Sequence, residues 1–147
     1  LRSIVEGRSI DAATVQRSRL DTARGLAAHL DAVVVLKGLG TVVATPSGEV
    51  WIATEGSSVL ATAGTGDVLA GLVGTLLAQG VSATRAACAG VLVHAVAGAC
   101  AGAELAERGE GAPTASDVAA RLGEAAAGLE GPDADQWMVH LPRQRWG

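Results

Sequence analysis

The chain carries a short segment rich in glycine and threonine directly ahead of one aspartate, Asp67, and an apolar run follows at once. The segment contains Thr62, Gly64, Thr65 and Gly66. Glycines adopt backbone conformations that other residues avoid, and their missing side chains let a ligand approach the amides. At the start of a helix, unpaired N–H groups and the positive end of the helix dipole attract an anion, above all a phosphate. The residues therefore predict a phosphate-binding loop, to which the two threonine hydroxyls would add donors.

Asp67 is the candidate catalytic residue of this loop. A carboxylate in this place would repel a phosphate, which suggests that it has a chemical role. As a general base, Asp67 would take the proton from a hydroxyl that attacks phosphorus. The alternative is that Asp67 only caps the helix. Two glycines within the three preceding residues favour the catalytic interpretation. The segment is neither a Walker loop, since no GK[ST] follows, nor a GxGxxG motif, since the next glycine is Gly71.

A second candidate for phosphate binding is the stretch LKGLGT at 36–41. Lys37 follows an almost continuous β-branched run that is typical of a buried strand, and a charge next to such a strand is costly unless it is compensated. Gly38 and Gly40 come next, and Thr41 opens the following strand. A lysine at a strand end among glycines could hold a nucleotide phosphate, whereas the alternative is a lysine that reaches solvent beside an ordinary turn.

The sequence context of one histidine and of both cysteines predicts structural roles for them. His94 lies in an apolar stretch and is predicted to be a hydrogen-bonded core histidine rather than a catalytic one. Cys88 and Cys100 are twelve residues apart in one helical stretch, about 18 Å along a helix axis, so no disulfide can join them. They are predicted to be free thiols, as in a reducing cytoplasm. The sequence has no CxxC and no His/Cys cluster, and we predict no metal-ligating residues.

Strands and then helices must position these residues. Helical spacing runs over Asp11–Leu30, with Asp11 as the N-cap. The predicted strands are Val33–Leu36, Thr41–Thr45 and Val50–Thr54. The predicted later helices are Asp67–Gln79, ended by Gly80, then Ala83 to about Arg108, and a third helix capped by Thr114 or Ser116. The tail 131–147 shows no clear period and is left unassigned. We expect an α/β fold, with helices packed on a mainly parallel sheet and the Thr41–Thr54 segment forming an antiparallel pair.

Composition limits the class of protein. The 147 residues are enough for one domain, and the 49% of hydrophobic residues include no Phe or Tyr, so small aliphatic side chains must form the core. A net charge of −4 without a basic stripe argues against nucleic-acid binding. The uncharged stretch Ala86–Ala103 is long enough to span a bilayer, but it lacks the Leu, Ile and Phe that drive insertion. We predict a buried helix there, no membrane partner, and a cytoplasmic homo-oligomer.

Residues from about 11 to 130 resemble the ADP-dependent NAD(P)H-hydrate dehydratases of the ribokinase-like superfamily. The resemblance lies in "VVVLKGLGTVVATPSGEVWIAT" followed by "LATAGTGDVLAGLVGTLLAQG". The GTGD element indicates the superfamily, and its pairing with LKGxGTVVA points to the dehydratases. "VLVHAVAGA" and "TASDVAARL" fit the helices that follow in that family.

The resemblance implies a nicotinamide nucleotide repair enzyme. Such an enzyme dehydrates hydrated NADH or NADPH back to NADH or NADPH, with ADP as phosphoryl donor and Mg²⁺ as cofactor, and releases AMP and phosphate. Asp67 would contact the hydrated cofactor and act as the base. The resemblance places the adenine nucleotide against the Thr62–Gly66 loop and against Lys37, Gly38, Leu39, Gly40 and Thr41.

Ribokinase-like enzymes also use an N-terminal half that includes a glycine-rich segment, which this sequence lacks, and the first residue is Leu1 rather than Met. We therefore expect residues 1–147 to be the C-terminal part of a single ribokinase-like nucleotide-binding domain. Two alternatives stay open. One is a ribokinase-like small-molecule kinase for a vitamin precursor or sugar. The other is a truncated, non-catalytic chain that binds nucleotide.

Overall fold

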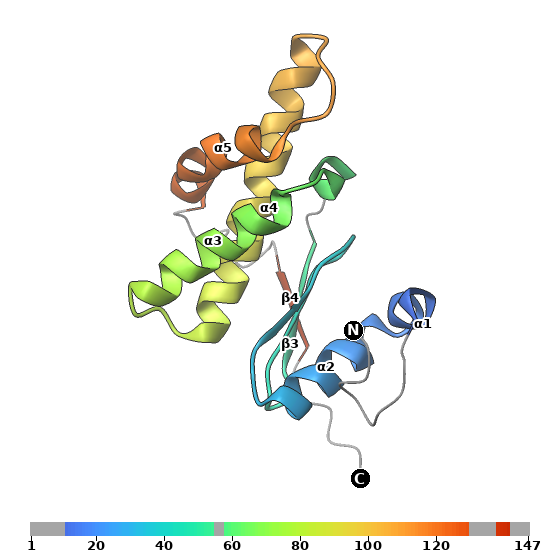
Figure 1. Ribbon diagram of the computed structural model, residues 1–147. Coiled ribbons are helices and arrows are strands. Elements are labelled where there is room, and N and C mark those ends of the chain that lie inside the picture. Colours follow the sequence, from blue (N-terminus) through green and yellow to red (C-terminus); the bar gives the residue numbers. More distant parts are fainter. Residues whose placement is uncertain (1–10, 55–57, 130–137, 142–147) are drawn as a thin grey trace.

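The computed structural model describes residues 11–54, 58–129 and 138–141, which form a mixed α/β protein (Figure 1). Two helices precede the sheet, and three longer ones follow its first three strands. The elements in chain order are α1 (Ala12–Arg17), α2 (Arg19–Leu30), β1 (Val34–Leu36), β2 (Val42–Ala44), β3 (Val50–Ala53), the 3-10 turn η1 (Ser58–Ala61), α3 (Thr65–Ala78), α4 (Ala83–Glu107), α5 (Ala115–Gly128) and β4 (Met138–Leu141).

The four strands form one sheet in the order β1-β2-β3-β4, and every neighbouring pair is antiparallel. The predicted β2–β3 pair is confirmed, but the prediction of a mainly parallel sheet is wrong for the described residues. A parallel pair needs a crossover of about a dozen residues or more. The connections 37–41 and 45–49 have five residues each, so consecutive strands can only turn back on each other.

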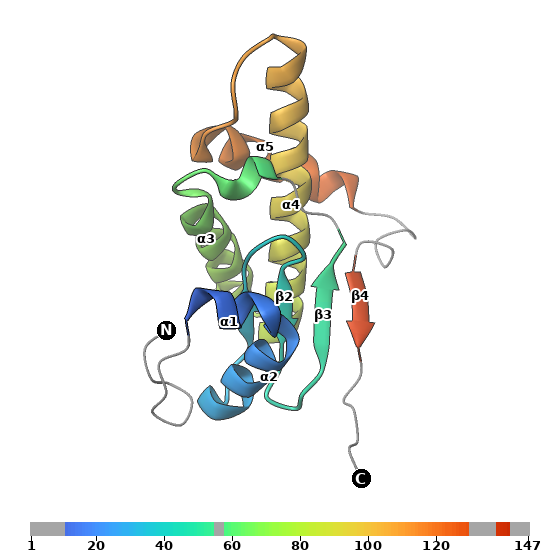
Figure 2. The ribbon, with the colours of Figure 1, turned by 90° about the vertical axis from the view of Figure 1, so that its right-hand side faces the viewer.

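Helices cover both faces of the sheet. In Figure 1, α2 lies on one side of the strands and α3 with α4 on the other, and Figure 2 looks onto the sheet through α2. Side chains of β2 alternate between the two layers: Val42 and Ala44 face α2, and Val43 packs with Leu69 and Val91. β2 is therefore buried throughout.

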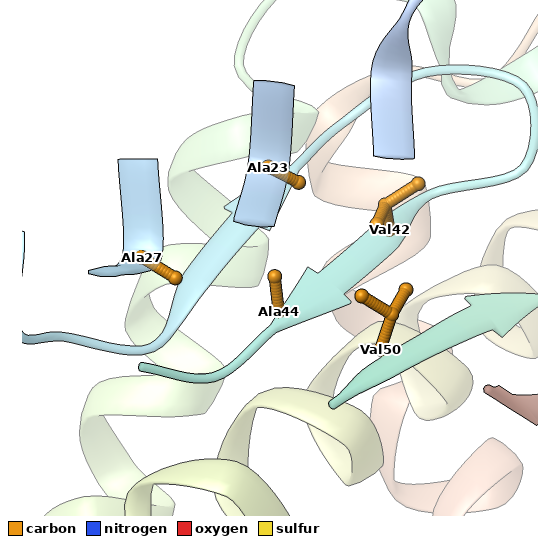
Figure 3. Packing of buried hydrophobic residues seen from close by; sticks show 5 residues of the cluster. All are labelled: Ala23, Ala27, Val42, Ala44 and Val50. Atoms are coloured by element: carbon orange, nitrogen blue, oxygen red, sulfur yellow. The ribbon is translucent and has the colours of Figure 1, made fainter. Parts of the chain in front are cut away.

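Small side chains allow α2 to pack closely on the sheet. Ala23 and Ala27 of α2 have no exposed surface and contact Val42, Ala44 and Val50 (Figure 3). No side chain in this cluster is larger than valine, which agrees with a core built without Phe or Tyr. These contacts fix α2 against the sheet.

The structure confirms the predicted caps of two helices, but it also shows a helix break and a strand that were not predicted. The Asp11 side chain accepts from the Thr14 N–H at 2.6 Å, and Thr114 forms a capping box with Asp117, so the first cap is confirmed and Thr114 is the correct one of the two proposed for α5. The predicted helix Asp11–Leu30 is interrupted at Ser18. Within the unassigned tail, β4 pairs with β3, and His140 stacks on Trp51 with ring centroids 4.7 Å apart.

α4 is the central helix. It is the one described helix that is long and apolar enough to cross a membrane, a test that core helices also pass, and 56% of its most apolar window is buried inside the protein. It contacts α3, α5, η1 and the strands β2 and β3. The structure thus confirms the prediction that this stretch is a buried helix.

Gly90 sets how closely α4 approaches α3. A Cβ added at Gly90 would lie 2.5 Å from Cγ2 of Val73, a β-branched side chain that has one preferred rotamer in a helix. We expect Gly90→Ala to lower the free energy of unfolding by about 1–2 kcal/mol, because the overlap outweighs the better helix propensity. Gly123→Ala in α5, where no described residue lies within 4 Å of the added Cβ, should raise it by about 0.5–1 kcal/mol. Urea denaturation of both variants measures the two signs, and stabilisation by Gly90→Ala would contradict the packing argument.

Candidate active site

The structure brings the two predicted phosphate-binding segments together. Lys37 stands at the end of β1, and its Nζ lies 3.1 Å from the position that a Cβ of Gly66 would occupy. Gly66 is the second residue of α3. The lysine ammonium therefore lies over the N-terminal turn of a helix, whose dipole is also positive there. In Figures 1 and 2, the β1–β2 connection and the start of α3 lie at the same end of the sheet.

Gly64 shapes the entry into α3. It is the N-cap residue with φ +86°, and a Cβ there would lie 3.1 Å from the Cβ of Ala115. Its carbonyl accepts from the N–H groups of Asp67 at 3.0 Å and Val68 at 3.2 Å. The N–H of Gly66 has no acceptor within the described part of the chain. A free amide beside the Lys37 ammonium is suited to an anionic ligand.

The hydroxyls of both loop threonines lie close to backbone carbonyls of the segment 59–62. Thr65 is buried, and its hydroxyl lies 2.8 Å from the carbonyl oxygen of Leu60 and 2.9 Å from that of Thr62. These contacts give the Thr65 hydroxyl a structural role in the loop, and its predicted contact with a ligand stays a prediction. Thr62 is half-buried, and its hydroxyl donates to the Val59 carbonyl at 3.3 Å.

His94 of α4 forms a buried hydrogen bond with the same loop. It is 3% exposed, and its Nε2 lies 2.7 Å from the carbonyl oxygen of Thr65. Since a carbonyl only accepts, Nε2 must carry the proton. Burial lowers the pKa of His94, the hydrogen bond to Thr65 raises it in part, and the charge of Lys37 lowers it further. The prediction of a hydrogen-bonded core histidine is confirmed.

The buried His94 makes stability depend on pH. Its pKa is lower in the folded chain than in the unfolded chain, where histidine titrates near 6.5, so the unfolded state binds the proton first as pH falls. The contribution of His94 is complete above about pH 6.5 and is lost as pH falls towards its folded pKa. We expect His94→Gln, which keeps an N–H donor, to flatten the fall in unfolding free energy between pH 7.5 and 5.5. Denaturation at both pH values measures this, and the same slope in wild type and variant would contradict it; His29→Gln, at an exposed site, should keep the wild-type slope.

Asp67 is the third residue of α3, because the helix begins at Thr65 rather than at Asp67 as predicted. The N-cap is Gly64, and none of the side chains that the structure describes caps this helix end. The capping alternative for Asp67 is therefore wrong. Its side chain is exposed and accepts no hydrogen bond within the described ranges. An exposed carboxylate one residue beyond the free amide of Gly66 is accessible to a ligand bound over the turn.

The loop 37–41 is glycine-dependent and exposed. Gly38 has φ +143° and Gly40 has φ +65°, and the Thr41 hydroxyl donates to the Gly38 carbonyl at 3.0 Å. Leu39 is 83% exposed. An exposed leucine beside the phosphate-binding elements offers an apolar surface for a base or ring.

Sequence reasoning missed Arg19, the first residue of α2. Its guanidinium donates to backbone carbonyls at and beside the loop 37–41. The only signal available was an arginine at the start of a predicted helix, seventeen residues before its first partner, and spacing alone does not reveal such a contact.

The donor set of the site matches magnesium only in part. Groups of three or more His, Cys, Asp or Glu that could hold a metal are not found among the described residues. Asp67 is the one acidic residue of the 58–67 segment. Mg²⁺ in nucleotide sites often takes one or two carboxylates, with phosphate oxygens and water completing its shell. The site fits a metal carried by a nucleotide rather than one held by a protein cage.

Comparison with known proteins identifies the family. The profile described as NAD(P)H-hydrate dehydratase matches residues 5–120. The chain is 49% identical over 85 residues to the ADP-dependent (S)-NAD(P)H-hydrate dehydratase of Neisseria meningitidis, covering 58% of this chain and 29% of that protein. It is 40% identical over 97 residues to the bifunctional NAD(P)H-hydrate repair enzyme Nnr of Escherichia coli, covering 66% of this chain and 19% of that protein.

Solved structures agree in fold. The ADP/ATP-dependent NAD(P)H-hydrate dehydratase of Bacillus subtilis, co-crystallised with ATP/Mg²⁺ and soaked with CoA, matches with a TM-score of 0.69 and 33% identity. The match covers 82% of this chain and 44% of that one. The chain thus spans less than half of the solved chain and less than a third of the two curated relatives named above. It belongs to the NAD(P)H-hydrate dehydratase family.

Proposed function

We propose that this chain supplies the nucleotide-facing and base-bearing part of an enzyme that repairs hydrated NADH and NADPH. ADP donates its terminal phosphoryl group to the ring hydroxyl of the hydrated cofactor, and AMP leaves. The phosphate is then eliminated with a ring proton, which restores the dihydronicotinamide. The products are NADH or NADPH, AMP and phosphate.

The observation that carries this proposal is the position of the Lys37 ammonium over Gly66, one residue before Asp67. The phosphates of ADP bind between Lys37 and the free amide of Gly66, and both groups stabilise negative charge that shifts between oxygens during transfer. Leu39 and the loop 37–41 lie against the nucleoside part. Asp67, exposed at the same turn, takes the proton of the attacking hydroxyl.

Mg²⁺ enters with the nucleotide in this proposal. The metal lowers the negative charge of the phosphates when bound, and Asp67 is the side chain of the loop that can reach its water shell. The related Bacillus subtilis enzyme was co-crystallised with ATP and Mg²⁺ together, which supports this expectation. Cytoplasmic location and homo-oligomerisation stay predictions, as does the assignment of residues 1–147 to the C-terminal part of one domain.

The experiment is to supply the full chain with Mg²⁺, ADP or ATP, and hydrated NADH, and to follow the near-ultraviolet absorbance of the restored dihydronicotinamide. Calorimetry on the same sample measures nucleotide binding. Turnover with ADP supports the proposal. Binding without turnover supports the non-catalytic alternative, and transfer from ATP to a vitamin precursor or sugar supports the kinase alternative. Absence of nucleotide binding would overturn the assignment of the site.

A further inference from the structure

We propose that Arg19 is a positioning residue for the nucleotide site, although it lies outside both predicted motifs. Its guanidinium fixes the loop 37–41 so that the Lys37 ammonium stands over Gly66. This inference rests on the proposed function, because it assigns a role to Arg19 in nucleotide binding at that site.

Arg19 holds both ends of the loop with one nitrogen. Its Nη2 lies 2.9 Å from the carbonyl oxygen of Leu36, 3.1 Å from that of Lys37 and 3.3 Å from that of Gly40. Its Nη1 donates to Oε1 of Gln16 at 3.2 Å, which orients the guanidinium plane. Hydrogen bonds from a charged donor are about twice as strong as neutral ones, so this contact restricts a loop whose two glycines give it unusual freedom.

Gly38 and Arg19 fit each other. A Cβ at Gly38 would lie 2.7 Å from Nη1 of Arg19 and 3.0 Å from Nη2. The guanidinium therefore occupies the space where another residue would have its side chain. The glycine serves two needs at once, since its φ of +143° also disfavours any side chain.

The direction of the carbonyls sets the direction of the amides. In a trans peptide the C=O and the following N–H point to opposite sides. By drawing three carbonyls towards itself, Arg19 turns the N–H groups of Lys37, Gly38 and Thr41 away from its own charge. These amides and the Lys37 ammonium are donors of the kind that bind phosphate.

No carboxylate lies within ion-pair distance of Arg19 in the part of the chain that the structure describes. Its contacts there are three backbone carbonyls and one amide oxygen. The full positive charge consequently stays beside the loop. A positive charge that no carboxylate neutralises favours the binding of an anion nearby, which a surface ion pair would not do.

The test compares Arg19→Ala with Arg24→Ala. Arg24 lies on the same helix. Its Nε also donates to a backbone carbonyl, that of Gly48 at 3.2 Å in the β2–β3 connection. Calorimetry with Mg²⁺-ADP is run at a temperature where both full-length variants are folded. We expect Arg19→Ala to raise the Kd about tenfold, and Arg24→Ala to change it by less than about twofold. Millimolar guanidinium chloride, but not sodium chloride, should restore part of the affinity of Arg19→Ala.

The outcomes separate the two proposals. If wild type binds Mg²⁺-ADP and Arg19→Ala binds equally well, the inference is wrong and the proposed function stands. If Arg24→Ala weakens binding as much as Arg19→Ala, and guanidinium rescues neither, Arg19 is only a structural residue and the inference is also wrong. If wild type itself binds no nucleotide, the proposed function fails first, and the role of Arg19 fails with it.

Discussion

Replacing Asp67 by asparagine should lower turnover of hydrated NADH by roughly two to four orders of magnitude. Asparagine has the same size but cannot accept the proton of the attacking hydroxyl. Affinity for ADP should hold or rise slightly, because a negative charge beside the phosphates is removed. The Asp67 side chain is exposed and caps nothing, so the free energy of unfolding should change by less than about 1 kcal/mol through the helix dipole.

Asp21→Asn is the matched control for that experiment. Asp21 is also the third residue of its helix, α2, and is also exposed, but it lies outside the site. It should show the same small change in stability with normal turnover. Absorbance assays give turnover, calorimetry gives ADP affinity and urea denaturation gives stability. Near-normal turnover in Asp67→Asn would show that Asp67 is not the base.

The candidate site could be predicted from sequence because its signals are local. Two glycines before Asp67 and two around Leu39 predict backbone that a ligand can approach, and each signal lies within six residues. What spacing could not show is that Lys37 and Gly66 meet, since 29 positions separate them. That expectation came from the family resemblance, and the position of Lys37 Nζ, 3.1 Å from where a Cβ of Gly66 would lie, agrees with it.

The prediction of a mainly parallel sheet is wrong because a β-branched run has the same appearance in parallel and antiparallel strands, whereas the PSG turn correctly predicted the antiparallel β2–β3 pair. The stretch 33–36 looks like a strand buried on both faces, yet β1 is half-buried at the edge of the described sheet. The deciding information was the five-residue length of the connections 37–41 and 45–49, which allows only reversal. β4 has four residues and no period of its own, and its place depends on pairing with β3.

The sequence pattern predicts the start of α3 two residues late, at Asp67 instead of Thr65, for a physical reason. Asp is a common N-cap, and the pattern alone favours it as a boundary. In the structure, Gly64 adopts φ +86° and its carbonyl accepts the first N–H bonds, while His94 and the Thr65 hydroxyl fix the next residue. The His94 contact spans 29 positions and lies outside any short window of sequence. With Gly64 as the N-cap, Asp67 is not needed to cap the helix.

Gly66→Val should abolish measurable ADP binding, a loss of at least about 100-fold. Gly66 has an ordinary helical backbone, since it is not among the residues with positive φ, so valine is tolerated by the main chain. The new Cβ would lie 3.1 Å from Lys37 Nζ, and its two methyl groups would extend into the space of the phosphate. The lysine is the flexible end of an exposed side chain and can move away, so the melting temperature should stay nearly unchanged.

Gly74→Val separates loss of the anion site from a change in helix propensity. Gly74 lies in the same helix and is exposed, and an added Cβ there would have no atom of the described residues within 4 Å. It should bind ADP as wild type does, with a small change in melting temperature. Gly66→Ala should fall between the two, because a single methyl group displaces Lys37 by only a few tenths of an ångström. Calorimetry and thermal denaturation measure ADP affinity and melting temperature for the three variants. Normal ADP affinity in Gly66→Val would mean that the phosphate binds elsewhere. Equal losses of affinity in Gly66→Val and Gly74→Val would mean that the helix, and not the free amide of Gly66, had been damaged.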